Sequence, residues 1–277
     1  MTGKDTSGTR FAPSLVGLPV IGGMFVFLLN EAPSHYSLVN SSALMIGLLF
    51  AHLVRAPEDI GRVRYVIAGL LFLLCLPMIL GPSIDGVARW LPLGPVQLHS
   101  GQLLIPPLAV LSVRLGESGT WPLAVALVIC GLQPDAASCL ALTLVLSTLA
   151  LRNRDWKPMR VALLGLAVTA QACWRGDLPP VAFVENVLPF LWSDLKEPVQ
   201  AVGIGLLLLM PFAIILFRHF PLADRLALVA AYFGFLIASL LGPYPVPLVG
   251  YGAASIIGML AGLAMIGRAK DVGVRPS

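Results

Sequence analysis

Long apolar runs dominate this chain, and short polar breaks that carry Gly, Pro and Arg separate them. A helix that crosses a membrane needs roughly 20 consecutive apolar residues, and the pattern predicts ten such helices. They lie near 13–30, 37–54, 64–81, 97–113, 120–133, 135–151, 160–174, 199–217, 225–241 and 248–267. The fourth and fifth runs are short, and the fourth contains Pro106 and Pro107, so we expect it to be kinked or tilted. The predicted fold class is therefore all-α, a polytopic integral membrane protein.

The distribution of positive charge tests the number of spans, because cytoplasmic loops of membrane proteins retain Lys and Arg. With ten spans and a cytoplasmic N-terminus, 15 of the 18 Lys and Arg residues fall inside, and only Arg89, Arg175 and Lys196 fall outside. Removing one span would move a basic cluster to the wrong side. We therefore predict cytoplasmic N and C termini and one domain over 1–277, with 175–198 as the sizeable outer segment. The net charge of +4 then reflects orientation rather than nucleic-acid binding.

Composition excludes a soluble protein. Hydrophobic residues make up 57% of the chain and charged residues only 12%, whereas soluble proteins have about 25% charged residues. The four cysteines all lie inside apolar runs and are interpreted as small core residues rather than a disulfide framework. The four histidines are scattered, so the sequence gives no support to a histidine metal site. The first dozen residues lack the apolar core of a secretory signal, so we expect the first span to stay in the mature protein.

The outer stretch 85–95 places Arg89, one of the three external cations, next to Trp90. Two interpretations are open. Trp at the headgroup level and a neighbouring Arg form an interfacial anchor that binds lipid phosphates nonspecifically, and the residue types alone favour this interpretation. Alternatively, the planar guanidinium of Arg89 binds a phosphate or pyrophosphate on a lipid-linked substrate.

Two carboxylates lie at outer turns. Asp135 follows Pro134 and is placed to cap the next helix, or to pair with Arg89 or another helix, because charges close to membrane depth find partners. Glu185 belongs to the apolar stretch 179–192, which we interpret as a short helix in the outer interface. It either faces water from an amphipathic turn or has a raised pKa that suits a general base.

The last span opens with Gly and Pro and continues with small residues. Ala254, Gly258 and Gly262 recur at every fourth position, which allows another helix backbone to approach closely. Packing is the default interpretation of this stripe. Tyr251 and Ser255 precede or enter the stripe, and they are candidates to add hydrogen bonds in a water-filled groove.

Three stretches, in this order and topology, resemble motifs of the SEDS family, the shape, elongation, division and sporulation proteins of the RodA and FtsW type. Residues 86–102, GVARWLPLGPVQLHSGQ, are similar to the family's G-x-R-R-W-I-x-L-G-P-x-x-x-Q-P-S-E stretch. LQPDAASCLAL at 132–142 is similar to L-Q-P-D-L-G-T-A-L-V-L, and PVPLVGYGAAS at 245–255 to P-L-P-F-I-S-Y-G-G-S-S. The resemblance is clearest from about 60 to 265, and the first spans match in topology alone.

This resemblance implies a peptidoglycan glycosyltransferase that polymerises lipid II on the outer face of the bacterial inner membrane, in cell division or cell-shape maintenance. It implies a class B penicillin-binding protein as partner and lipid II, or another undecaprenyl-pyrophosphate-linked sugar, as substrate. Aligning Pro180 with the family's P-E-A-H-T-D-F stretch puts Glu185 on its essential aspartate, so Glu185 is the candidate catalytic base. The candidate substrate-binding residues are Arg89, Trp90, Gln102, Asp135, Tyr251 and Ser255. No cofactor is implied, and Mg²⁺ would suit the pyrophosphate although no ligand set requires it.

Several departures from the family pattern keep a second hypothesis open. The family's Q-P-S-E is His99-Ser100-Gly101-Gln102 here, the first Arg before the Trp is Ala88, and the outer loop is shortened to 175–198. A catalytically inactive, SEDS-like scaffold that binds a penicillin-binding protein or a division component is therefore the alternative. On that hypothesis, bulky substitutions at Gly258 or Gly262 would break complex formation. A transporter of lipid-linked precursors is the third option, but nearly every charge lies at the end of a span.

Overall fold

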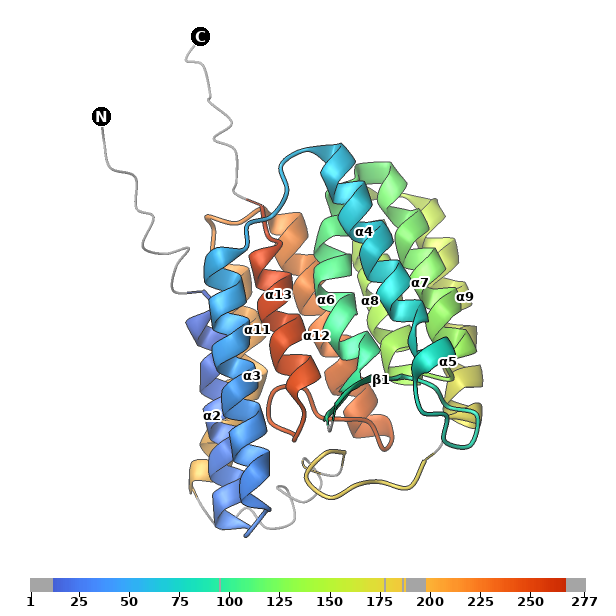
Figure 1. Cartoon of the computed structure of the whole chain (residues 1–277). Coiled ribbons are helices and arrows are strands. Elements are labelled where there is room, and N and C mark those ends of the chain that lie inside the picture. Colours follow the sequence, from blue (N-terminus) through green and yellow to red (C-terminus); the bar gives the residue numbers. More distant parts are fainter. Residues whose placement is uncertain (1–11, 95, 177, 186, 188–197, 268–277) are drawn as a thin grey trace, which may run out of the picture.

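A computed structural model describes residues 12–267 except 95, 177, 186 and 188–197, and within these the chain is a bundle of long helices with one small hairpin (Figure 1). The helices are α2 (Ser14–Leu29), α3 (Ser34–Leu53), α4 (Ile60–Cys75), α5 (Pro77–Leu80), α6 (Ser100–Val113), α7 (Thr120–Leu132), α8 (Ala136–Asn153), α9 (Trp156–Arg175), α11 (Pro198–Leu216), α12 (Leu222–Leu241) and α13 (Ala253–Ala264). A 3₁₀ turn, Gly116–Gly119, precedes α7. Strands β1 (Trp90–Leu93) and β2 (Val96–His99) pair antiparallel, with Trp90 opposite His99.

The predicted all-α membrane fold is confirmed, and each of the ten apolar runs contains one long helix. Within the described residues, four helical stretches are long and apolar enough by themselves to cross a membrane, and five shorter apolar helices accompany them. The run predicted at 64–81 divides into α4 and α5, which follow one another closely. The helix α6 continues through both Pro106 and Pro107. Large apolar side chains such as Leu53, Phe72 and Leu216 stay exposed, as expected where acyl chains cover the protein.

The connections alternate between the two ends of the bundle (Figure 1). The described basic residues predicted to be cytoplasmic, among them Arg62, Arg114 and Arg152, belong to connections or helix ends at one end. The β hairpin and the loop before α13 lie at the other end, which is the outer end by the positive-inside rule. The terminal cations Lys4, Arg10, Arg268, Lys270 and Arg275, and Lys196, lie outside the described residues.

The centre of the bundle is a tight contact between α6 and α13. A Cβ atom added at Gly258 would lie 2.8 Å from the carbonyl oxygen of Leu103 and would also collide with the carbonyl oxygen of Gln102. At Gly262 the added atom would meet Leu228 and Pro106. The predicted close helix approach is therefore present, but inside this chain. The default interpretation of the stripe as helix packing is therefore confirmed, with α6 and α12 as the neighbours of the two glycines, and the effect of bulky substitutions on complex formation stays a prediction.

We expect Gly258→Ala to lower the free energy of unfolding by about 1–3 kcal/mol, because overpacking a tight contact costs that much. The measurement is thermal unfolding of the purified protein in detergent. Gly69→Ala is the matched control, since Gly69 lies in α4 with nothing within 4 Å of an added Cβ. It should be neutral or stabilise the helix slightly. Equal effects of the two substitutions would contradict the assigned α6–α13 contact.

Candidate site at the outer end of the bundle

Side chains from four separate parts of the sequence meet at the outer end of α6 and α8. The hairpin β1–β2 brings Arg89 to the start of α6, because Ser100 donates two hydrogen bonds to the carbonyl oxygen of Arg89, from its N–H at 2.9 Å and from its Oγ at 3.1 Å. The first part is thus the hairpin with the start of α6, and the second is Asp135 at the start of α8. The third and fourth parts are the turn at 181–185 and the loop between α12 and α13. All candidate residues except Trp90 and Tyr251 are buried.

Arg89 is fully buried at 0% exposure and is the largest of the fully buried side chains that the structure describes. Its Cζ lies 4.8 Å from the ring centroid of Trp90 and 5.3 Å from that of Tyr244, so two aromatic faces cover the charge. Within the described part of the chain, none of its three guanidinium nitrogens has a hydrogen-bond partner. Because protein atoms enclose this guanidinium, it does not fit the interpretation of Arg89 as an exposed interfacial anchor. A buried charge without a hydrogen-bonded partner costs several kcal/mol, so the environment of Arg89 needs a reason other than stability.

Asp135 caps α8, as predicted, and it is also 0% exposed. Its Oδ1 accepts the N–H of Ser138 at 3.2 Å, and its Oδ2 accepts the hydroxyl of Ser138. Its Oδ2 lies 3.6 Å from Nε2 of His99, which is slightly longer than a hydrogen bond. Gly101 is required here, because an added Cβ would lie 2.9 Å from Oδ2 of Asp135 and would collide with Ser138.

His99 is a part of this site that the sequence did not reveal. Its Nδ1 accepts the N–H of Gln102 at 3.3 Å and so caps α6. Because Nδ1 is an acceptor, the neutral ring carries its proton on Nε2, on the side of Asp135. Burial lowers the pKa of His99, with the nearby Asp135 opposing this shift and Arg89 adding to it. The lowered pKa favours a neutral His99 ring beside the Asp135 carboxylate and within electrostatic range of Arg89.

Gln102 connects α6 to the proline-rich loop before α13, because its Nε2 donates to the carbonyl oxygen of Pro245 at 2.8 Å. In the family motif a glutamate stands at this position, and an ionised glutamate has no donor for this hydrogen bond, whereas the neutral amide has one. The departure from Glu to Gln thus has a local structural reason.

Glu185 is 6% exposed, so the interpretation in which it faces water is wrong. Its Oε2 accepts the N–H of Val181 at 2.7 Å and closes the turn at 181–185. Burial raises the pKa of Glu185, while the hydrogen bond from Val181 and the positive charge of Arg89 oppose the shift. The structure thus brings a buried acid within electrostatic range of the buried guanidinium. The rest of the predicted interface helix, 186–192, lies outside the described residues except Val187.

Ser255 and Tyr251 both hold the loop before α13 in shape. Ser255 Oγ accepts the N–H of Leu248 at 3.2 Å, where Leu248 has a positive φ of 69°. The Tyr251 ring stacks on Tyr36 of α3, with centroids 3.8 Å apart and an interplanar angle of 12°. His35 contacts both tyrosine rings at their edges. The predicted role of Tyr251 and Ser255 in lining a groove stays a prediction.

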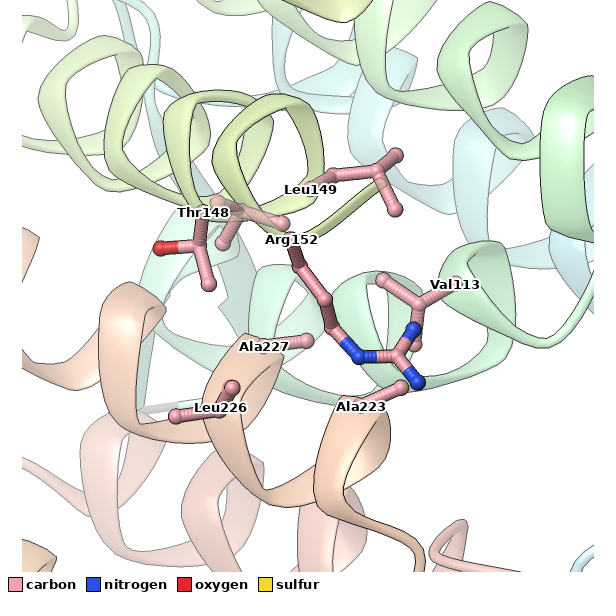
Figure 2. A pocket seen from close by; sticks show the side chains of 8 residues that line it. Val113, Thr148, Leu149, Arg152, Ala223, Leu226 and Ala227 are labelled. Atoms are coloured by element: carbon pink, nitrogen blue, oxygen red, sulfur yellow. The ribbon is translucent and has the colours of Figure 1, made fainter. Parts of the chain in front are cut away.

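Two further observations bear on what the site binds. Among the described residues, no group of three His, Cys, Asp or Glu side chains is placed to hold a metal ion. A small hollow lies between α6, α8 and α12, where the Arg152 side chain extends toward Val113 and Ala223 (Figure 2). It is at the cytoplasmic end and takes no part in the site around Arg89.

Comparison with known proteins identifies the fold. No family model matches the sequence, and no curated protein matches it. Among solved structures, the chain is similar to the rod shape determining protein RodA of Thermus thermophilus, with 23% identity and a TM-score of 0.64 over 93% of this chain and 94% of that one. An aspartate-to-alanine mutant of the same RodA gives 24% identity and a TM-score of 0.65, with 96% of each chain covered.

A third solved structure is a chain of a peptidoglycan synthase complex, described as coordinating polymerization and crosslinking. It is 22% identical to this chain, with a TM-score of 0.64 over 96% of this chain and 97% of that one. The chain therefore has the RodA fold over nearly its whole length. The resemblance to the SEDS family that the three motifs predicted is confirmed at the level of the fold.

Proposed function

We propose that this protein is a divergent SEDS-type peptidoglycan glycosyltransferase, which polymerises lipid II on the outer face of the bacterial inner membrane. The observation that carries the proposal is the buried guanidinium of Arg89, which has no hydrogen-bond partner among the described residues, within electrostatic range of the buried Glu185. A glycosyl transfer with a pyrophosphate leaving group needs one cation for the departing charge and one base for the attacking hydroxyl. The RodA fold supports the same function class.

Arg89 is assigned to the pyrophosphate. Its planar fork suits phosphate oxygens, and a bound anion would satisfy the three nitrogens that have no partner among the described residues. Because the side chain is fully buried and the rings of Trp90 and Tyr244 cover its charge, the substrate reaches it only after part of this cover moves aside. Trp90 is assigned to the cover, and Asp135 holds the start of α8.

Glu185 is assigned as the general base. Its carboxylate takes the proton of the acceptor sugar hydroxyl, and the hydroxyl oxygen attacks the anomeric carbon of the donor. A glycosidic carbon–oxygen bond forms while the bond from that carbon to the pyrophosphate oxygen breaks. Undecaprenyl pyrophosphate leaves with the bonding electron pair, and the Arg89 charge stabilises it. A base contributes typically about 10²–10⁴-fold to such a step.

A class B penicillin-binding protein is the proposed partner. One of the similar solved structures is a peptidoglycan synthase complex, and a polymerised glycan strand needs crosslinking by a second activity. The test is glycan-strand synthesis from labelled lipid II by the purified protein, alone and with the class B penicillin-binding proteins of the host. Polymer formation supports the proposal, and no polymer under any partner condition rejects it.

The pH dependence of polymerisation provides a prediction about the base. Glu185 acts only when it is deprotonated, and burial raises its pKa, so activity should fall with acidification at a higher pH than an exposed carboxylate would give. Initial rates measured across acidic and neutral pH give the pH at which activity falls. His99, whose pKa is lowered, also titrates at acidic pH. His99→Asn keeps the cap of α6 and should leave the pH at which the rate falls unchanged. If that pH shifts in this variant, the fall in rate reports protonation of His99 and not of Glu185.

A non-catalytic scaffold remains the second candidate function, and one observation favours it. Glu185 accepts a hydrogen bond from Val181 in its own turn, and this contact is sufficient to explain a buried carboxylate without catalysis. On this hypothesis Glu185→Ala leaves the assembly with the penicillin-binding protein intact and wild type makes no polymer. Co-purification of the complex, measured beside polymerisation, separates the two functions.

A further inference from the structure

Asn40 lies on α3 and hydrogen-bonds to the loop before α13. Among the described side chains of α2 and α3, it is the one buried amide that makes such a contact. It is 0% exposed. Its Nδ2 donates to the carbonyl oxygen of Gly250 at 3.1 Å, and its Oδ1 accepts the N–H of Gly252 at 3.1 Å. Both hydrogen bonds cross more than 200 residues of sequence.

These two bonds attach the loop before α13 to the α2–α3 hairpin. Gly252 has a φ of 157° at the start of α13. From α2, Gly23 lies so close to Val249 that an added Cβ would be 2.8 Å from its Cα. The amide of Asn40 therefore clamps the loop 246–252 against the α2–α3 hairpin. Leaving its partners unpaired in a buried site would cost roughly 1–3 kcal/mol for each group.

The clamped loop in turn holds the turn that carries Glu185. The N–H of Tyr251, between the two clamped glycines, donates to the carbonyl oxygen of Phe183 at 2.7 Å. The N–H of Val246 donates to the carbonyl oxygen of Val184 at 3.1 Å. The ring of Phe183 also lies edge-on to Tyr36 on α3, with centroids 6.2 Å apart. Contacts thus run from Asn40 to the loop and from the loop to the residues just before Glu185.

We propose that Asn40 is a positioning residue, which holds the turn at 181–185 and its Glu185 in place through the loop 246–252. Asn40 touches no candidate catalytic atom itself. Its effect on catalysis rests on the proposed function of Glu185, whereas its effect on the position of the turn does not. Two measurements therefore address the two statements separately.

The first measurement is hydrogen exchange by mass spectrometry on the full-length protein in detergent. Asn40→Leu keeps a side chain of similar size and removes both hydrogen bonds. We expect faster exchange in peptides covering 181–185 and 246–252, with the cytoplasmic ends of the helices unchanged. Ser41→Ala is the matched control, because Ser41 Oγ contacts the carbonyl oxygen of Ser37 at 2.7 Å and Sδ of Met24 at 3.0 Å, both within the α2–α3 hairpin. Exchange that is unchanged in Asn40→Leu, or equally faster in Ser41→Ala, overturns the proposal.

The second measurement is polymerisation of labelled lipid II with the partner present. Asn40→Leu should lower kcat by about 10–100-fold, since a misplacement of about 1 Å costs roughly that much, and leave KM unchanged. In a Glu185→Ala background, Asn40→Leu should not lower kcat further, because both substitutions act on the same catalytic step. A rise in KM at constant kcat, or additive losses, overturns positioning through Glu185.

The outcomes stay distinguishable if one part fails. Wild type without activity would reject the proposed function, and the exchange result alone would then decide whether Asn40 holds the turn. If Asn40→Leu does not accumulate as folded protein, Asn40→Asp takes its place. It keeps the acceptor for the N–H of Gly252 and removes the donor to Gly250, so faster exchange in the same two segments is expected and its absence overturns the proposal.

Discussion

Glu185→Ala should reduce polymerisation of lipid II by about 10²–10⁴-fold, the contribution of a positioned general base. The variant removes the proton acceptor and the hydrogen bond to the N–H of Val181, which leaves one backbone donor unpaired in a small turn. The folded protein should still accumulate, because the backbone hydrogen bonds from Tyr251 and Val246 to this turn remain in the variant. The measurement is the initial rate of glycan-strand synthesis together with the yield of purified protein.

Two companions sharpen the result. Glu185→Asp keeps the carboxylate but shortens the side chain by one methylene, and a displacement of about 1 Å should cost roughly 100-fold. Asp85→Ala is the matched control, because Asp85 is an exposed carboxylate in the outer segment before β1, and it should keep wild-type activity. Full activity of Glu185→Ala would remove Glu185 from the mechanism, and equal losses in both alanine variants would reject a specific role.

Arg89→Met should raise the stability of the folded protein while it abolishes productive binding of lipid II. A buried guanidinium without hydrogen-bonded partners costs several kcal/mol, and an apolar side chain of similar length removes that cost. The lost cation–π contacts with Trp90 and Tyr244 offset about 1–2 kcal/mol of the gain. We expect a net stabilisation of about 1–3 kcal/mol, measured as thermal unfolding in detergent. Lipid II affinity and polymerisation should both fall by at least about 10-fold, since charged hydrogen bonds are worth roughly 1.5–3 kcal/mol each.

A substitution that raises the stability and lowers the activity indicates that Arg89 binds a ligand. A cation that stabilises the fold would give a loss of stability instead. Arg175→Met provides the comparison, because Arg175 is an exposed external cation at the end of α9. It should change neither quantity by much, as exposed charges contribute little. A destabilised Arg89→Met would show that the guanidinium already has a partner that stabilises the fold, and retained polymerisation would exclude it from pyrophosphate binding.

The RodA-like fold was predictable in outline because the bilayer imposes strong, local constraints. Backbone groups must be hydrogen-bonded within each span, so apolar run length alone predicts helices. The alternation of basic connections then predicts orientation. The cap at Asp135 was equally predictable, since an acid after Pro134 at the start of a run is a local signal. At Gly258 the close packing was predictable but the neighbouring helix was not, because a small-residue stripe indicates that a helix approaches but not which helix.

The sequence by itself determined the ten helices, their orientation and the residue types at the outer end. Only the tertiary structure decided that Arg89 and Glu185 are buried, that His99 lies beside Asp135 and that Asn40 clamps the loop before α13. Each of these depends on contacts between segments that are distant along the chain, and hydrophobic periodicity carries no information about such contacts. A buried charge looks the same in sequence as an exposed one, because burial is a property of what packs around it.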